Sequence, residues 1–316
     1  MSATSSRVIR VITLIVILSA MVGITSAGDP TVGTINPATA ITGENAGDWI
    51  GSGGAYVLPS GNVVIASPQW GGTMGAVTCL TPAEYRVGGI TINSANSLTG
   101  DSSGDFVGNT VIVLATGDYV VASYSWDNDG QSELGAVTWV DGETCIPFGE
   151  TSRAATVSAA NSMVGTSANN RVGLNGVTPL PNGNYVIISP TWSTGGVQVG
   201  AVTWCRATSP CVGQVSAANS LIGQTHLDNI GSHFITVLSN GNYVVSSQLW
   251  NGGRGATTWC SGTTPCVGVV SPTNSLVGTI QQAHGTWVVK LNNGNYVVDS
   301  PGWGDGVSQI GRASCR

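Results

Sequence analysis

The sequence repeats one unit five times, and this repetition limits the folds open to the chain. A turn of the type NGN recurs, and a tryptophan follows its central glycine after nine residues. The pairs are Gly61 and Trp70, Gly117 and Trp126, Gly183 and Trp192, Gly241 and Trp250, and Gly294 and Trp303. A segment similar to GAVTW follows each pair, and in four copies a segment similar to NSLVG follows that one. Periods of this length predict units that each pack on their neighbours.

Each unit is predicted to form four short antiparallel strands. In the third copy these are GVTPL, NYVIISPTW, GAVTW and the segment from Val212 to Gly223. Val, Ile, Thr, Tyr and Trp favour strands, and Asn182-Gly183 favours a hairpin turn because both residues tolerate positive φ. Four-stranded units of about 40 to 60 residues are typical of propeller blades. The sequence therefore predicts an all-β fold, a five-bladed β-propeller with four antiparallel strands per blade.

The two ends of the chain match each other. The segment DPTVGTINPATAITG, residues 29–43, aligns without a gap with TPCVGVVSPTNSLVG, residues 264–278. The fifth copy supplies three strands and stops at Cys315-Arg316, which aligns with Trp259-Cys260. Residues 31–43 are therefore predicted to be the fourth strand of the last blade, a three-plus-one closure that leaves no open edge. Residues 28–316 then form a single domain.

The N-terminus predicts export. Arg7 and Arg10 precede VITLIVILSAMVGI, and small residues follow up to Ala27. This pattern is typical of a signal peptide, here residues 1–27, and the apolar run is shorter than the ~20 residues of a membrane span. The whole sequence carries a net charge of −6 without a basic cluster, which argues against nucleic acid and anionic lipid as partners. We expect a secreted or cell-surface protein with no membrane span after cleavage.

The cysteines fit an exported protein. Cys205 and Cys211 flank the turn between the third and fourth strands of one copy, and Cys260 and Cys266 repeat the spacing. We expect two hairpin disulfides, because a zinc site would need closer cysteine pairs and histidine partners. The sequence does not assign the pairing of Cys79, Cys145 and Cys315, and the odd number leaves at least one thiol free or intermolecular.

The repeat resembles one found in tandem in secreted bacterial proteins, with the motifs NGNYVVxSPxW, GAVTW and NSLVGT. The first motif stands here at residues 184–186, 242–245 and 295–298, and the likeness covers essentially the whole mature chain. The resemblance implies a propeller-like repeat and secretion, and it implies no biochemical activity. The chain departs from the pattern at Cys79 and Cys315, which stand where the other copies have tryptophan.

The sequence does not predict an enzyme. GDSSG at residues 100–104 fits G-x-S-x-G, but that elbow joins a strand to a helix, and the other copies hold unrelated loops there. The first strands of the units read GGAYVL, NTVIVL, GVTPL, HFITVL and WVVKL, and none contains Asp or Glu. They offer Tyr56, His233 and Lys290 to a central channel, where a glycosidase would need two carboxylates.

Binding is better indicated, through a face of variable loops. The loops between units and those between second and third strands are predicted to share one face, and Asp48, Asp105 and Asp228 recur in the former. If the tryptophans that end the second strands are exposed there, they would stack on sugar rings beside these acids. If instead they pack between units, they are structural. The candidate tryptophans are Trp70, Trp126, Trp192, Trp250 and Trp303.

Calcium is a further alternative, raised by Asp127, Asp129 and Glu133 in WDNDGQSE. An EF-hand places its glycine sixth, whereas Gly130 is fourth, and a turn rich in Asp and Asn needs no metal. We therefore expect no cofactor. The sequence predicts a secreted binding or adhesion module for an extracellular glycan or surface protein. The alternative is a structural protein of the cell envelope without a small ligand, and a glycoside-acting enzyme ranks third.

Overall fold

The structure is a computed structural model that describes residues 39–128, 130–279 and 287–300, and the backbone of residues 312–315. It is all-β and contains five repeats, and each repeat begins with a run of antiparallel strands. The first repeat contains β1 (Gly54–Val57), β2 (Val63–Ser67), β3 (Ala76–Leu80) and β4 (Leu98–Thr99). The second contains β5 (Thr110–Val113), β6 (Tyr119–Ser123), β7 (Ala136–Val140) and β9 (Ser162–Val164).

The later repeats follow the same order. The third contains β10 (Val177–Pro179), β11 (Tyr185–Ser189), β14 (Ala201–Cys205) and β16 (Leu221–Ile222). The fourth contains β17 (Phe234–Val237), β18 (Tyr243–Ser247), β19 (Ala256–Cys260) and β21 (Ser275–Val277). The fifth contains β22 (Trp287–Lys290), β23 (Tyr296–Ser300) and β24 (Arg312–Cys315).

Short elements decorate the loops. A small hairpin is formed by β12 (Ser193–Thr194) and β13 (Val197–Gln198). Three helical turns are α2 (Trp70–Thr73), α3 (Pro82–Val87) and α4 (Trp250–Gly253). None of the helices in the described part of the chain is long and apolar enough to cross a membrane.

One short strand in each of three repeats connects that repeat to the preceding one. These strands are β8 (Ala155–Thr156), β15 (Gly213–Gln214) and β20 (Gly268–Val269), and they pair in parallel with β4, β9 and β16. The sequence predicted one fourth strand from Val212 to Gly223. The structure divides this segment, so that β15 joins the second repeat and β16 remains in the third. The sheets of the first three repeats therefore each contain one short strand from the following repeat.

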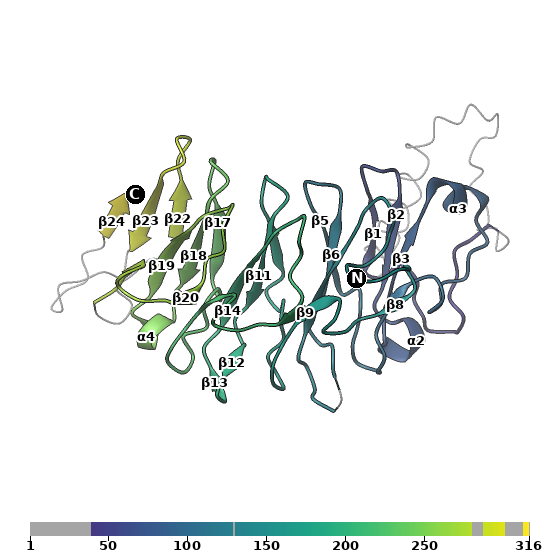
Figure 1. Ribbon diagram of the computed structural model, residues 1–316, viewed down its shortest axis with the longest axis horizontal. Coiled ribbons are helices and arrows are strands. Elements are labelled where there is room, and N and C mark those ends of the chain that lie inside the picture. Colours follow the sequence, from purple (N-terminus) through teal and green to yellow (C-terminus); the bar gives the residue numbers. More distant parts are fainter. Residues whose placement is uncertain (1–38, 129, 280–286, 301–311, 316) are drawn as a thin grey trace, which may run out of the picture.

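The repeats stand side by side in an open row (Figure 1). The hairpin turns between first and second strands lie along one side, and α2, α4 and the β12–β13 hairpin lie along the other. β1 and β22–β24 lie toward opposite ends of the row, so the sheets do not close into a ring and no propeller is found.

The predicted three-plus-one closure is not seen. Thr42 pairs in parallel with Thr91 of the first repeat, although the sequence predicted that its segment completes the last one. The rest of the predicted closing strand, residues 31–38, lies outside the described residues, as does the predicted signal peptide.

The apolar core lies between neighbouring sheets. One cluster joins Val64 and Val77 of the first repeat to Val111 and Val121 of the second, and similar clusters follow along the row. All five residues of the second strand are buried in each of the first four repeats. A repeat therefore cannot bury its apolar faces alone, and the row is stabilised by nearest-neighbour contacts.

Candidate functional site

The tryptophan that follows the second strand is buried in the first four repeats, between neighbouring sheets for Trp126, Trp192 and Trp250 and beside the N-terminal segment for Trp70. The exposed fraction is 5% for Trp70, 1% for Trp126, 3% for Trp192 and 7% for Trp250. Each belongs to an apolar cluster, and Trp126, for example, packs in the cluster shared by the first two repeats. Buried indoles offer no face to a sugar ring, so this burial favours the packing role for these four tryptophans. Trp303 lies outside the described residues.

The predicted acidic ligands are buried as well. The exposed fraction is 4% for Asp48, 0% for Asp105 and 1% for Asp228. Each carboxylate accepts hydrogen bonds from backbone N–H groups of its own loop, such as those of Gln224 and Thr225 to Asp228, both at 2.8 Å. This is the local bonding for which Asp favours turns.

The same carboxylates also bind each inter-repeat loop to the backbone of the following repeat, at the residue directly after its tryptophan. The N–H groups of Gly71, Asp127 and Asn251 donate to Asp48, Asp105 and Asp228 over 3.1, 3.0 and 2.7 Å. In the third repeat Asn170 takes this place, and its Nδ2 donates to Ser193 Oγ at 2.8 Å. In the structure the carboxylates are thus occupied by backbone donors, and ligand binding by these acids stays a prediction.

Glycines at the start of third strands allow this loop to pack closely. Gly75, Gly135 and Gly200 have φ of +79°, +73° and +76°. A Cβ at each would lie 2.2 Å from a backbone nitrogen, which belongs to Val107, Val172 and Ile230 respectively. Only glycine fits such an approach. The inter-repeat loops thus lie against the ends of the loops between second and third strands, and both sets share one face, as predicted.

The acids considered for calcium bond to protein groups. Asp127 Oδ1 accepts the N–H of Glu133 at 2.6 Å, and Glu133 forms an ion pair with Arg171. Asp129 lies outside the described residues. Among the residues that the structure describes, no group of three or more His, Cys, Asp or Glu side chains is arranged to hold a metal ion.

The described residues form three disulfides. Cys205–Cys211 and Cys260–Cys266 are the hairpin disulfides expected from their spacing. Cys79–Cys145 joins the first two repeats, and the sequence had not assigned it. Cys79 stands at the position of Trp204 and Trp259, so a covalent bond at this junction replaces an indole. Disulfides are consistent with an extracellular protein.

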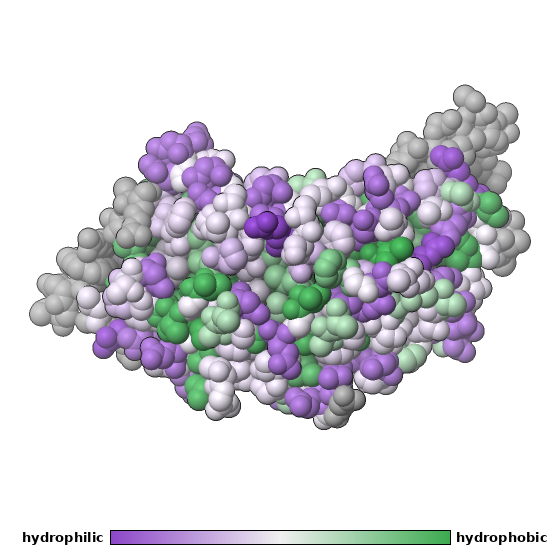
Figure 2. Space-filling view, viewed as in Figure 1, coloured by the Kyte–Doolittle hydropathy of each residue, from purple (hydrophilic) through white to green (hydrophobic). Residues whose placement is uncertain are grey.

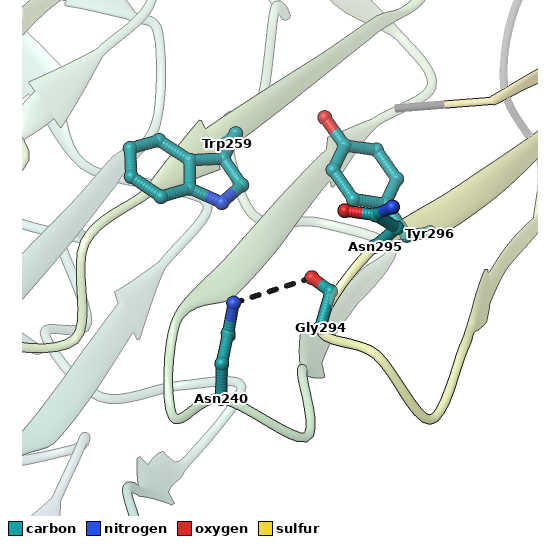
Figure 3. Close-up of a pocket in the computed structure, with 5 residues that line it drawn as sticks. All are labelled: Asn240, Trp259, Gly294, Asn295 and Tyr296. Atoms are coloured by element: carbon teal, nitrogen blue, oxygen red, sulfur yellow. Dashed lines mark hydrogen bonds between the residues drawn. The ribbon is translucent and has the colours of Figure 1, made fainter.

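One open pocket lies between the fourth and fifth repeats. It has a volume of about 340 Å³ and is lined by Asn240, Trp259, Gly294, Asn295 and Tyr296. Figure 3 shows the indole of Trp259 and the ring of Tyr296 on one side, and the Nδ2 of Asn240 donating to the Gly294 carbonyl at 3.3 Å. None of these residues was among the predicted ligands.

The preceding junction is filled at the equivalent place. There the Gly262 carbonyl oxygen accepts hydrogen bonds from Asn182 Nδ2 at 2.8 Å, Asn184 Nδ2 at 3.0 Å and Trp204 Nε1 at 3.2 Å. Trp204 is 6% exposed, whereas the corresponding Trp259 is 43% exposed. Asn240, the counterpart of Asn182, also donates to a carbonyl, that of Gly294, so the NGN sequence itself gives no signal that separates the open junction from the filled one.

A second group of exposed aromatic side chains lies near the same end of the row. The rings of Phe234 on β17 and Trp287 on β22 stack with centroids 5.5 Å apart, and His233 lies 4.1 Å from Phe234. Phe234 and Trp287 are 46% and 55% exposed. On the face seen in Figure 2, apolar residues form separate patches across the middle of the row.

Comparison with known protein families finds one match. The model of the family described as "Repeat of unknown function (DUF5650)" matches residues 57–109, 113–174, 179–232, 237–285 and 290–314. The chain belongs to this family. The five matched segments correspond to the five repeats of the structure, and they confirm the repeat number read from the sequence. The description of the family assigns no activity, and no curated protein matches the chain.

Proposed function

We propose that the protein is a secreted structural scaffold that acts by contact with other macromolecules and performs no chemistry. The observation that carries this proposal is the use of the repeated Trp and Asp side chains. These residues carried the glycan hypothesis; the tryptophans are buried in four repeats, and the three aspartates are buried and accept hydrogen bonds from the backbone. The disulfides and the predicted signal peptide support export. The first strands lack the paired acids of a glycosidase, which supports a role without catalysis.

Glycan binding is the second candidate, and the pocket between the fourth and fifth repeats favours it. Trp259 presents a half-exposed indole, and Asn240 and Asn295 place amide groups beside it. An aromatic face with polar groups around it is suited to a sugar ring and its hydroxyls. Glycan binding would then take place at this pocket and not at the buried tryptophans that the sequence had suggested.

A glycan array separates the two candidates. The mature chain, residues 28–316, is screened once with calcium and once with a chelator. The scaffold proposal predicts no saturable binding in either condition. Saturable binding that Trp259→Ala abolishes, and that the exposed-tryptophan control Trp49→Ala retains, would overturn it in favour of the pocket. Binding lost only with the chelator would assign a role to calcium.

The five-bladed ring stays a prediction for the same repeats. It requires residues 31–43 to pair with β24 of their own chain, which would bring the two ends of the row together. A ring in solution would be a compact monomer, whereas the row is elongated, and small-angle scattering distinguishes these shapes.

A further inference from the structure

The N-terminal segment, Ala40–Thr42, is bonded along one edge and, within the described residues, not along the other. On the first edge, Thr42 N–H donates to the Ile90 carbonyl at 2.9 Å, and Ile92 N–H donates to the Thr42 carbonyl at 2.8 Å. Ile41 makes no backbone hydrogen bond within the described residues. Because neighbouring residues of a strand point their backbone groups to opposite sides, the groups of Ile41 face the other edge.

This segment is equivalent to the fourth strand of a repeat. Thr42 corresponds to Thr99, Val164 and Ile222, whose carbonyls accept an N–H from the following repeat at 3.0 Å in the same way. On its other edge, each of those strands pairs antiparallel with a third strand, as β4 does with β3, β9 with β7 and β16 with β14. The N-terminal segment is thus a fourth strand for which the described residues contain no third strand.

The opposite end of the row has the complementary arrangement. β24 is the third strand of the fifth repeat and pairs with β23 on one edge. In the other four repeats a fourth strand covers the second edge, as β21 covers β19. The described part of the chain provides no fourth strand for β24. An open strand edge is a template for another strand.

We propose that Ala40–Thr42 of one copy binds to β24 of a second copy as its antiparallel fourth strand. The register of β19 with β21 gives the pairs Arg312 with Thr42, Ala313 with Ile41, and Ser314 with Ala40. The two surfaces lie at opposite ends of the row, so the contact is head to tail and extends into open chains of copies. This assembly rests on the scaffold function proposed above and names its partner.

The burial of side chains supports the same partner. Leu98, Met163 and Leu221 occupy the position of Ile41 in the first three repeats and are 3%, 2% and 1% exposed, whereas Leu276 in the fourth is partly buried. Ile41 is only partly buried in the single chain. A second copy would cover it as the third strands cover its counterparts, and the contact therefore gains apolar burial as well as backbone bonds.

The junction between copies is expected to be weaker than those within the chain. In the first four repeats a buried Thr and Ser hydroxyl pair bridges the third and fourth strands at 2.7 Å, as Thr258 and Ser275 do. Between copies Ser314 would face Ala40, which has no hydroxyl. We therefore expect reversible assembly that depends on concentration.

Two variants test each surface separately. Ile41→Pro removes a backbone N–H that makes no hydrogen bond within the described residues. Ala313→Pro removes a backbone N–H that points away from β23, because alternate residues of an antiparallel strand direct their N–H groups to opposite edges. Ile41→Val is the control that keeps the N–H. Thermal unfolding of each variant verifies that the chain is folded.

Sedimentation equilibrium of the mature chain measures the outcome. The wild type and Ile41→Val should grow beyond the dimer with concentration, and each proline variant alone should show at least a tenfold weaker association. An equal mixture of the two proline variants should form dimers and no larger species, because it contains one intact donor and one intact acceptor. A wild type that stays monomeric up to ~1 mM, or a mixture without dimers, would overturn the assembly. The glycan array tests the scaffold proposal independently.

Discussion

Asp105 provides the sharpest test of how neighbouring repeats are joined. Its carboxylate is fully buried and accepts four hydrogen bonds at 3.0 Å. Three come from the N–H and hydroxyl of Ser102 and the N–H of Asp101, within the loop. The fourth comes from the N–H of Asp127, which follows Trp126. Asp105→Asn exchanges one acceptor oxygen for an NH₂ group without changing the size of the side chain.

The cost of this exchange can be estimated from the bonds that are lost. The remaining oxygen can serve the two loop N–H groups, as Asn170 Oδ1 serves those of Thr166 and Ser167 at 2.8 and 3.1 Å. The new NH₂ group then faces the N–H of Asp127, so one donor loses its charged acceptor. Such a loss in a buried site costs about 2 to 3 kcal/mol.

The third repeat suggests a rescue. There Asn170 Nδ2 donates to the hydroxyl of Ser193, which occupies the place of Asp127. Asp127→Ser introduces that acceptor beside the new amide at position 105 and alone costs about 1 kcal/mol, since it removes the bond from Glu133 N–H. The double variant should therefore lose at least about 1 kcal/mol less than the sum of the two single losses.

Urea unfolding of the wild type, the two single variants and the double variant measures all four free energies with the disulfides intact. A loss below about 0.5 kcal/mol for Asp105→Asn would refute the proposed cost of the buried donor. Single losses that simply add in the double variant would refute the comparison with the third repeat.

Two further predictions concern covalent and ionic contacts. Replacing Cys79–Cys145 by two serines should lower the free energy of unfolding by ~4 kcal/mol, against ~2 kcal/mol for Cys205–Cys211, because the sequence separations are 66 and 6; equal losses in urea unfolding would contradict this. The hydrogen bond from Arg153 lowers the pKa of Glu84 to about 2, so the stabilisation is complete above the unfolded pKa of ~4.3 and is lost as the pH falls toward 2. The pair of Arg153 and Glu84 is partly exposed and contributes less than ~1 kcal/mol to the free energy of unfolding. Glu84→Gln should therefore flatten the pH dependence of the melting temperature between about pH 2 and ~4.3. An unchanged slope would disprove the assignment.

Much of the local structure could be predicted from the sequence. The NGN turns, the runs of strand-forming residues around positions such as Val186 and the spacing of Cys205 and Cys211 each act within a few residues of the chain. They therefore determined the five repeats, their strands, the hairpin disulfides and the shared face of the two loop sets.

The candidate site could not be predicted in this way. A tryptophan or aspartate at a repeated position fits exposure and burial equally well from the sequence. Trp126 is buried because the sheet of the first repeat packs against it, and Asp105 is buried where its loop bonds to the residue after Trp126, so both depend on contacts between repeats. Likewise, Trp204 and Trp259 hold equivalent positions, and only the loop at Gly262 covers the first.

The arrangement of the repeats was decided by tertiary structure alone. The match between residues 29–43 and 264–278 predicted that the N-terminal segment is a fourth strand, and within the described residues Thr42 makes the parallel bridge that such a strand makes, as Val164 does. Which third strand it meets depends on the angle between successive sheets, summed over five repeats. That angle is determined by the packing of side chains between sheets and by parallel strands such as β15, so a row and a ring follow from the same local pattern.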